Sequence, residues 1–364
     1  MNGGRYIRLY TLLSASVLLL IATAGWSQSL TWLGVLPGGS WGRSSGVSAD
    51  GSVVVGRGSI NAGYWRAFRW TQATGMQNLG TLGGNSSQAI SVSADGSVVV
   101  GEAYNAAERP RAFRWTQATG MQDLGTLPSG NWSEARAVSA DGSVVVGRAE
   151  IPASSRAFRW TQATGMQDLG TLPSGSFSEG YGVSADGNVV VGRASNAAAQ
   201  ARAFRWTQAT GIQDLGTLGG NLSEAYSVSA DGSVVVGLAR NATGQNRAFR
   251  WTASVGMEDL NTTYASLLTN GSVLWEARAI SPNGRYIAGY GRNAATGREE
   301  AFLLDTGFPL RGDVDRNGCV DDADLLQVLF AFGERGYRNE DLNWDGIIDD
   351  ADLLEVLFNF GSGC

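Results

Sequence analysis

The 364-residue chain contains no histidine and no lysine, so all 27 of its basic residues are arginine. This absence excludes a Ser-His-Asp or Cys-His nucleophile, a His general base, a His-ligated zinc ion and a Lys Schiff base. Any catalysis would therefore depend on Asp, Glu, Tyr, Arg or a bound metal. Charged residues make up only 16% and there are 7 prolines, whereas there are 51 glycines. This composition is typical of a turn-rich, mainly β protein.

Cysteine is nearly absent, and its two occurrences, Cys319 and Cys364, both lie near the C-terminus. In an oxidising compartment we expect a disulfide between them, which would stabilise the fold by roughly 4 kcal/mol for a loop of this length. Two free thiols are the alternative.

Residues 1–24 have the pattern of a secretory signal peptide. Arg5 and Arg8 precede a mostly apolar stretch from Leu9 to Ile21, and Ala22-Thr23-Ala24 offers a small-x-small cleavage site. An uncleaved membrane anchor is the alternative, although the stretch is short for a bilayer span. We expect bacterial export to the medium or the cell surface, with no membrane span after signal cleavage.

The acidic residues are concentrated at the C-terminus. Residues 313–364 hold 13 acidic residues and 3 arginines, a net charge of −10 against −6 for the whole chain. The remainder is close to neutral, so nucleic acid and anionic membranes are not expected partners.

Residues 29–305 consist of six repeats of 45 to 52 residues. Ser-Ala-Asp-Gly starts at Ser48, Ser93, Ser139, Ser184 and Ser229, with a diverged Ser-Pro-Asn-Gly at Ser281. Arg-Ala-Phe-Arg-Trp starts at Arg66, Arg111, Arg156, Arg202 and Arg247, with a degenerate copy at Glu300. A period of this length indicates a repeat architecture.

Each repeat contains four strand-like runs joined by short turns, as expected for a β-propeller blade. Ala-Asp-Gly and Thr-Gln-Ala-Thr-Gly supply a glycine for the tight turns. In the third repeat the predicted strands are Ala135–Ser139, Ser143–Arg148, Arg156–Thr161 and Met166–Gly170.

The ends of the repeat region favour a closed ring. Leu30–Leu36 matches a fourth strand, and the sixth repeat ends with a third strand at Glu300–Asp305. Pairing the two would remove two exposed sheet edges. The predicted fold is therefore mainly β: a six-bladed propeller closed by the N-terminal strand, followed by a small helical calcium module. A solenoid of stacked hairpins is the alternative.

The repeats resemble those of the extracellular HAF-repeat family. The resemblance rests on Arg-Ala-Phe-Arg-Trp, on Asp123–Leu127 (DLGTL) and on Ser139–Gly147 (SADGSVVVG), and it covers nearly all of 29–305. This chain has Arg where the family name expects His. The resemblance implies export and no particular activity.

Two sets of loops vary between repeats and would lie on one face of a propeller, where ligand sites tend to occur. Neutral drift in these loops is the alternative. Four carboxylates, candidate catalytic residues, occupy equivalent positions there: Glu134, Glu179, Glu224 and Glu276, with Arg43 and Gln88 in the other two repeats. Aromatic residues accompany them: Trp41, Trp132, Phe177 and Trp275. Such a set suits polysaccharide binding or a carboxylate glycosidase; a structural pairing of each Glu with an Arg or a backbone N–H is the alternative.

The third strand of each repeat carries a second arginine between Phe and Trp. We expect Trp70, Trp115, Trp160, Trp206 and Trp251 to pack between blades, and Arg69, Arg114, Arg159, Arg205 and Arg250 to pair with a repeated aspartate such as Asp123 or Asp168. An anion-binding ring of arginines is the alternative.

Residues 306–312 form a linker, and 313–364 contain two calcium-loop patterns with Gly at position 6. The first loop supplies Asp313, Asp315, Asn317, the Cys319 carbonyl, Asp321 and Asp324; the second supplies Asp341, Asn343, Asp345, the Ile347 carbonyl, Asp349 and Asp352. Hard oxygen ligands in this number predict two Ca²⁺ ions.

The same apolar helix follows each loop, from Asp321 (DDADLLQVLFAFG) and from Asp349 (DDADLLEVLFNFG), and no helix precedes the first loop. This arrangement, in 313–364, resembles the dockerin module. The resemblance implies calcium-dependent folding and a cohesin-like partner, bound in either of two orientations. Asp322-Ala323 and Asp350-Ala351 stand where family members commonly have Ser or Thr, which departs from the usual recognition pattern.

Three functions remain open. The first is a secreted, non-catalytic propeller that binds a ligand or surface and is anchored through the calcium module. The second is a glycoside hydrolase or lyase of a polysaccharide-degrading assembly. The third is a structural cell-surface protein.

Overall fold

A computed structural model describes residues 30–60, 63–268 and 270–364. The signal peptide predicted at 1–24 lies outside these ranges. Val35–Cys364 form one compact unit. No helix among the described residues is long and apolar enough to cross a membrane.

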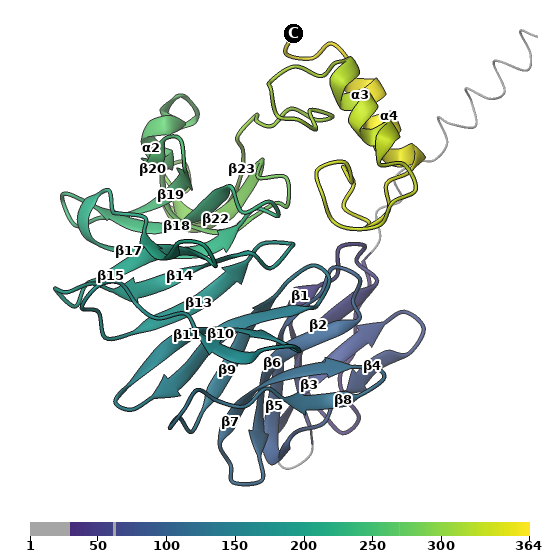
Figure 1. Cartoon of the computed structure of the whole chain (residues 1–364), viewed down its shortest axis with the longest axis vertical. Coiled ribbons are helices and arrows are strands. Elements are labelled where there is room, and N and C mark those ends of the chain that lie inside the picture. Colours follow the sequence, from purple (N-terminus) through teal and green to yellow (C-terminus); the bar gives the residue numbers. More distant parts are fainter. Residues whose placement is uncertain (1–29, 61–62, 269) are drawn as a thin grey trace, which may run out of the picture. The chain divides into compact units, whose positions relative to one another are not determined.

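Six antiparallel sheets follow one another along the repeats (Figure 1). The first three consist of β1 (Gly42–Val47), β2 (Val53–Ser59), β3 (Trp65–Thr71) and β4 (Gly75–Asn78); β5 (Gly83–Val92), β6 (Val98–Asn105), β7 (Pro110–Thr116) and β8 (Gly120–Asp123); and β9 (Ser133–Val138), β10 (Val144–Ile151), β11 (Ser154–Thr161) and β12 (Gly165–Asp168). The other three consist of β13 (Ser178–Val183), β14 (Val189–Ser195), β15 (Ala201–Thr207) and β16 (Gly211–Asp214); β17 (Gly219–Val228), β18 (Val234–Asn241), β19 (Asn246–Thr252) and β20 (Gly256–Asp259); and β21 (Val273–Ile280), β22 (Tyr286–Asn293) and β23 (Arg298–Asp305).

The strands pair in chain order within every sheet, as in the blades of a propeller. The four strands predicted for the third repeat are confirmed as β9 to β12, with ends shifted by a few residues. The first strands of successive sheets contact one another in the series β1, β5, β9, β13, β17 and β21. A short helix, α2 (Leu260–Thr263), and a 3₁₀ turn (Ala265–Leu267) precede β21.

The hydrophobic core lies between neighbouring sheets. One cluster combines Val100 and Ala112 of the second sheet with Val145, Phe158 and Trp160 of the third. Three of the tryptophans predicted to pack between blades, Trp115, Trp160 and Trp206, are 5–7% exposed. The second strand of each of these sheets is covered on both faces, which explains its continuous apolar run Val-Val-Val.

The Ser-Ala-Asp-Gly turn joins each sheet to the next through its backbone. The alanine N–H donates to the corresponding carbonyl of the following turn over 2.9–3.0 Å, along the series Ala49, Ala94, Ala140, Ala185, Ala230 and Pro282. Inside each turn the aspartate accepts from the serine hydroxyl, as Asp141 does from Ser139 at 2.6 Å. The series ends at Pro282, since proline has no N–H to donate.

The structure does not form the closing strand that was predicted at Leu30–Leu36. Residues 30–41 contain no strand, and the sixth sheet has three strands. The reason lies in Gly34, whose φ of +79° matches that of Gly125 (+80°) in the equivalent third-sheet connection. In both segments the glycine interrupts the extended backbone, so the Asp-Leu-Gly-Thr-Leu pattern is a connection and only the residues before it can pair.

The predicted pairing of Arg114 and Arg159 with aspartates is also wrong. The Nε atoms of these arginines donate to the carbonyls of Gly142 and Gly187 in the next sheet, at 3.3 and 3.1 Å. The aspartates instead lie near the first arginine of each motif, as Asp123 does near Arg111 at 3.8 Å. Because Asp123 is opposite Phe113, it shares a face with Arg111 and not with Arg114.

The C-terminal region forms α3 (Asp322–Phe330) and α4 (Asp350–Asn359), one after each predicted calcium loop. Asp321 and Asp349 cap these helices, each in a reciprocal pair with the aspartate three residues later. Val320, Val328, Ile348 and Val356 form a small core between the two halves. The expected disulfide joins Cys319 to Cys364.

We expect Gly142→Ala to destabilise the protein by about 2–4 kcal/mol. Gly142 has a φ of +72°, and an added Cβ would lie 2.4 Å from Cγ2 of Val98 in the preceding sheet. Gly120→Ala is the matched control, because Gly120 has a φ of +67° with nothing within 4 Å. Gly120→Ala should lower the free energy of unfolding by only about 1 kcal/mol, through backbone strain. Urea unfolding monitored by circular dichroism measures both, and equal losses would contradict the role assigned to this contact.

Candidate functional site

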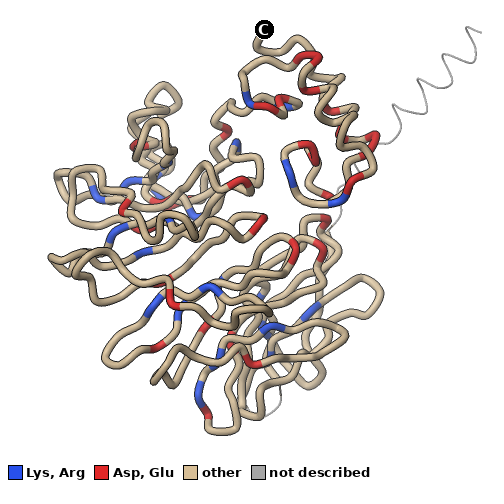
Figure 2. Tube along the Cα trace, in the orientation of Figure 1, with Lys and Arg blue, Asp and Glu red and all other residues tan. Residues whose placement is uncertain are grey.

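The four candidate carboxylates lie at one end of the first strands, each opposite a residue of the second strand. The cross-strand pairs are Arg43 with Arg57, Gln88 with Glu102, Glu134 with Arg148, Glu179 with Arg193, Glu224 with Leu238 and Glu276 with Tyr290. Paired residues of this kind point to the same face of a sheet. The structure therefore places an arginine directly beside two of the carboxylates. Figure 2 shows charged residues of both signs along the sheets.

Arginines of the second strands bridge neighbouring sheets. Arg148 contacts Glu134 of its own sheet at 2.8 Å and Glu179 of the next at 3.1 Å. Arg193 repeats this pattern, at 3.2 Å to Glu179 and 2.9 Å to Glu224. The pairing with arginine that the structural alternative requires is therefore present for these three glutamates.

The predicted aromatic residues lie against these arginines. The guanidinium of Arg148 is 5.2 Å from the ring centre of Trp132, and that of Arg193 is 5.7 Å from Phe177. Trp41 lies 5.6 Å from Arg43, whereas Trp275 packs edge-on against Tyr290 at 6.5 Å. Three of the four aromatic rings therefore orient an arginine, at about 0.5–1 kcal/mol each for partly exposed pairs.

The same end of the strands encloses a cavity of about 450 Å³. Its lining is Ile90, Glu134, Arg136, Tyr181, Glu224, Tyr226 and Arg278. The other five lining residues each lie two positions after the residue of the glutamate series (88, 134, 179, 224 or 276) in the same strand. Their side chains therefore lie on the same face of the sheet as the glutamates, one layer deeper.

Two tyrosines form the aromatic wall of this cavity. The rings of Tyr181 and Tyr226 are stacked with centres 6.0 Å apart, and their hydroxyls donate to Glu179 at 2.7 Å and Glu224 at 3.1 Å. Burial, together with these carboxylates, raises the pKa of both tyrosines. They therefore remain neutral donors at physiological pH.

The arginines complete the wall. Arg136 lies 5.1 Å from the Tyr181 ring and Arg278 4.3 Å from the Tyr226 ring. The buried Nε of Arg136 has no hydrogen-bond partner among the described residues. The lining thus combines two carboxylates, two guanidiniums and two phenols, with no net charge.

Burial alone would raise the pKa of Glu179, but the Tyr181 hydroxyl and the guanidiniums of Arg193 and Arg148 lower it overall. A carboxylate held ionised in this way is a poor general acid, because a general acid must keep its proton near neutral pH.

Glu102 is the exception to this pattern. It occupies the second-strand position that holds arginine in the sheets on either side, so no guanidinium of its own strand reaches Glu134. Burial and the Glu134 charge raise its pKa to about 7, against the opposing effect of Arg148, Arg136 and Arg57.

Sequence reasoning missed the second-strand residues and the deeper layer, namely Arg57, Glu102, Arg148, Arg193, Arg136, Tyr181, Tyr226 and Arg278. The signal was present in the repeats: the residue after Val-Val-Val-Gly varies as Arg, Glu, Arg, Arg and Leu between otherwise constant positions. The variable second-to-third strand loops predicted from the sequence, 57–65, 102–110 and 148–155, begin at this residue, but sequence reasoning assigned it no role at the site.

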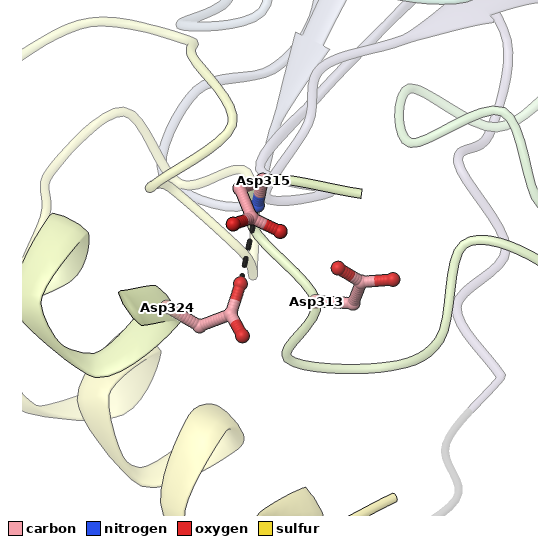
Figure 3. Close-up of side chains that lie close together, drawn as sticks. All are labelled: Asp313, Asp315 and Asp324. Carbon is pink, nitrogen blue, oxygen red and sulfur yellow. Dashed lines mark hydrogen bonds between the residues drawn. The ribbon is translucent and has the colours of Figure 1, made fainter. Parts of the chain in front are cut away.

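The first predicted calcium loop brings together Asp313, Asp315 and Asp324, whose ligand oxygens all lie within 4.8 Å of one another (Figure 3). Asp324 is fully buried and accepts from the N–H groups of Val314, Asp315 and Asp321 at 2.7–3.1 Å. Asp313 is 4% exposed, and its Oδ1 has no hydrogen-bond partner within the described part of the chain. Burial raises the pKa of Asp313, and the neighbouring Asp324 and Asp315 add to this effect.

The second loop repeats these hydrogen bonds. Asp352 accepts from Leu342, Asn343 and Asp349, and Asp341 accepts from Asp345 and Gly346. Burial, with the charges of Asp352 and Asp345, raises the pKa of Asp341 to about 6. In both loops the position-6 glycine has the expected positive φ, +93° at Gly318 and +87° at Gly346.

We expect Glu102→Gln to stabilise the protein above neutral pH. The folded state retains the Glu102 proton up to pH about 7, whereas the usual pKa is 4.5. The free energy of unfolding must therefore fall as pH rises through this interval. The variant should flatten this decline and raise Tm at pH 8 by a few degrees, measured by thermal unfolding from pH 4 to 8. Glu108→Gln, in an exposed turn of the same sheet, is the control; parallel profiles for wild type and Glu102→Gln would refute the assignment.

No protein-family model matches the sequence, and comparison with curated proteins finds no match. The structure is similar to TolB from Acinetobacter baumannii (18% identity, 58% of this chain, 52% of that chain, TM-score 0.41). It is also similar to a putative TolB from Agrobacterium tumefaciens (14% identity, 74% of this chain, 91% of that chain, TM-score 0.44). A third similar structure is an oligogalacturonate lyase from Vibrio parahaemolyticus (9% identity, 70% of this chain, 75% of that chain, TM-score 0.45). The chain thus spans about half of the first of these structures. At these identities the likeness concerns the fold alone, a mainly β arrangement of sheets that fit propeller blades.

Proposed function

We propose that this protein is a secreted, non-catalytic binding protein. Its six sheets act as the blades of a propeller that binds a neutral polysaccharide in the Tyr181–Tyr226 cavity. The C-terminal module, resembling a dockerin, anchors it through a calcium-dependent contact with a cohesin-like domain. The observation that carries the proposal is the charge balance of the cavity lining.

The cavity offers what a sugar ring requires. Stacked phenol rings provide an apolar face for C–H groups, while guanidinium donors and carboxylate acceptors lie around them. Since two carboxylates offset two guanidiniums, a neutral ligand can enter without leaving an unpaired charge. The free Nε of Arg136 is a donor that a ligand hydroxyl can satisfy.

The ion pairs favour binding over hydrolysis. A glycosidase needs one carboxyl group that is protonated and a second that is free to attack or to activate water. Glu134 and Glu179 are each held by arginines at 2.8–3.2 Å. Glu102, with its raised pKa, does not line the cavity. The alternative of a glycoside hydrolase or lyase is therefore the second candidate.

For the C-terminal module we propose two Ca²⁺ ions. Asp313, Asp315, Asn317, the Cys319 carbonyl, Asp321 and Asp324 would hold the first; Asp341, Asn343, Asp345, the Ile347 carbonyl, Asp349 and Asp352 would hold the second. The unpartnered Oδ1 of the buried Asp313 suits a cation ligand, because a buried carboxylate oxygen without a partner is unfavourable. Each ion would neutralise carboxylates that otherwise repel one another at neutral pH.

The helices of the module support an anchoring role. Leu326 and Leu354 are 47% and 46% exposed, and Phe330 and Phe358 are 82% and 80% exposed. Equal exposure at equivalent positions makes a surface with two similar halves, which fits a partner that binds in either orientation. Exposed apolar side chains in this number are typical of an interaction surface.

The carbohydrate proposal is tested by screening neutral and acidic oligosaccharides for binding by calorimetry and for cleavage by chromatography. Tyr226→Ala should bind a neutral hit about tenfold more weakly, through loss of one stacking face. Tyr64→Ala, which removes an exposed tyrosine outside the cavity, should bind like wild type.

Two results would count against the proposal. Preference for acidic sugars would contradict the charge balance. Cleavage by the wild type that disappears in Glu134→Gln or Glu179→Gln would favour the hydrolase.

The calcium proposal is tested by titrating the chelator-treated chain with Ca²⁺ in a calorimeter. Two ions should bind, and Asp315→Ala should leave one. Asp322→Ala is the control, because Asp322 is an exposed helix residue outside the ligand positions, and both ions should still bind. Binding of two ions to the Asp315→Ala variant would remove the first loop from the assignment.

A further inference from the structure

The end of the first strands opposite the charged cavity is apolar. Two layers line a second cavity of about 260 Å³ there, one of valine and isoleucine and one of alanine and proline. The layers are Val47, Val92, Val138, Val183, Val228 and Ile280, and then Ala49, Ala94, Ala140, Ala185, Ala230 and Pro282. The alanine layer belongs to the Ser-Ala-Asp-Gly turns, so the carboxylates of these turns surround the apolar opening.

Two aromatic residues of the C-terminal module complete the lining of this cavity, Tyr337 and Trp344. Both are partly buried. Because the alanines of the Ser-Ala-Asp-Gly turns line the same cavity, both aromatic side chains lie close to these turns.

A third residue of the module contacts the opposite part of the same ring. Arg316 forms an ion pair with Asp231 in the turn of the fifth sheet and also approaches the Ser233 hydroxyl at 3.3 Å. The two partners are 20% and 26% exposed. The acidic module thus presents one of its 3 arginines to an aspartate turn, and a tryptophan to an alanine ring.

The connection between repeats and module is fixed rather than free. Arg285 at the start of β22 pairs with Asp305 at 2.7 Å and donates to the carbonyl of Pro309 at 3.4 Å. Arg311 donates to the Tyr286 hydroxyl at 3.0 Å. A short connection held at both ends keeps the module near the turns at high effective concentration.

We propose that the C-terminal module binds the Ser-Ala-Asp-Gly face of its own chain and covers the apolar opening, and that calcium holds the loops in the conformation that makes this contact. Arg316 and Trp344 occupy the same position, the fourth, of the two calcium loops, and both have positive φ, +61° and +60°. Non-glycine residues adopt this conformation only where the surrounding loop imposes it. Without the ions, Arg316 and Trp344 would no longer be held in this conformation, and their contact with the Ser-Ala-Asp-Gly face would be lost.

The proposal is tested on the full chain by hydroxyl-radical footprinting, in which mass spectrometry measures how fast each side chain is oxidised. With calcium, Trp344 and Tyr337 should react slowly, and chelation should accelerate both severalfold. Phe358, which is 80% exposed and outside the contact, is the internal reference.

Two variants in the repeats weaken the contact without touching the module. Ala185→Arg places a large charged side chain in the alanine layer and should raise the Trp344 rate in calcium to that of the chelated protein. Asp231→Asn removes the ion pair, while an amide preserves the turn, as Asn283 does in the sixth sheet. It should raise the rate about threefold, the effect of one partly exposed ion pair.

Asp141→Asn is the matched control, because Asp141 occupies the same place in the third sheet and bonds only within its own turn. It should leave the Trp344 rate unchanged. Calcium stoichiometry, measured on every variant, shows that the loops still form. The proposal would be overturned if the oxidation rate of Trp344 stayed at the wild-type level in Ala185→Arg, or if chelation did not change it.

Discussion

The backbone hydrogen bond between successive Ser-Ala-Asp-Gly turns is the constraint on which the arrangement of sheets depends. It requires a small side chain beside the donor, an aspartate that closes the turn, and a glycine whose missing Cβ leaves room for the valine of the preceding sheet. Arg114 and its equivalents add a second bond to the same turn from the third strand. Most positions of the turn therefore make a contact within the turn or with the neighbouring sheet, and five of the six repeats keep the same four residues there.

Variation is consequently confined to the other end of the strands. There the residues of the first and second strands meet their neighbours through side chains alone, and the pairs can be exchanged. Arg148 and Arg193 each join two sheets, whereas Leu238 and Glu102 interrupt the series. Beside these bridges, tyrosine and arginine side chains of the deeper layer line the cavity. The same scaffold thus combines a constant end that holds the sheets together with a variable end suited to binding.

Local features could be predicted from the sequence, and features that depend on register could not. The turns, most strands and the capped helices each follow from a few adjacent residues, and the three aspartates of the first calcium loop follow from one loop pattern. The disulfide could be predicted because the chain has only 2 cysteines. The glutamate positions were found because they repeat, but their partners lie across a strand or in the next sheet. The same limitation caused Arg114 to be assigned to Asp123 in place of Arg111. The prediction of a closing strand was not met because it treated Gly34 as part of an extended run, although its counterpart Gly125 has a positive φ and turns the chain.

The two halves of the C-terminal module differ where the repeats contact it. Their helices are nearly identical, and equivalent apolar residues are equally exposed, as a partner that binds in either orientation requires. The fourth loop positions are unlike, however, with arginine in one half and tryptophan in the other. A symmetric external partner does not explain this difference. The Ser-Ala-Asp-Gly face does, because Arg316 pairs with one of its aspartates and Trp344 lies against its alanines. In the two proposals, the helices and the loops would serve separate contacts, so that a partner on the helices and a covered apolar opening could coexist.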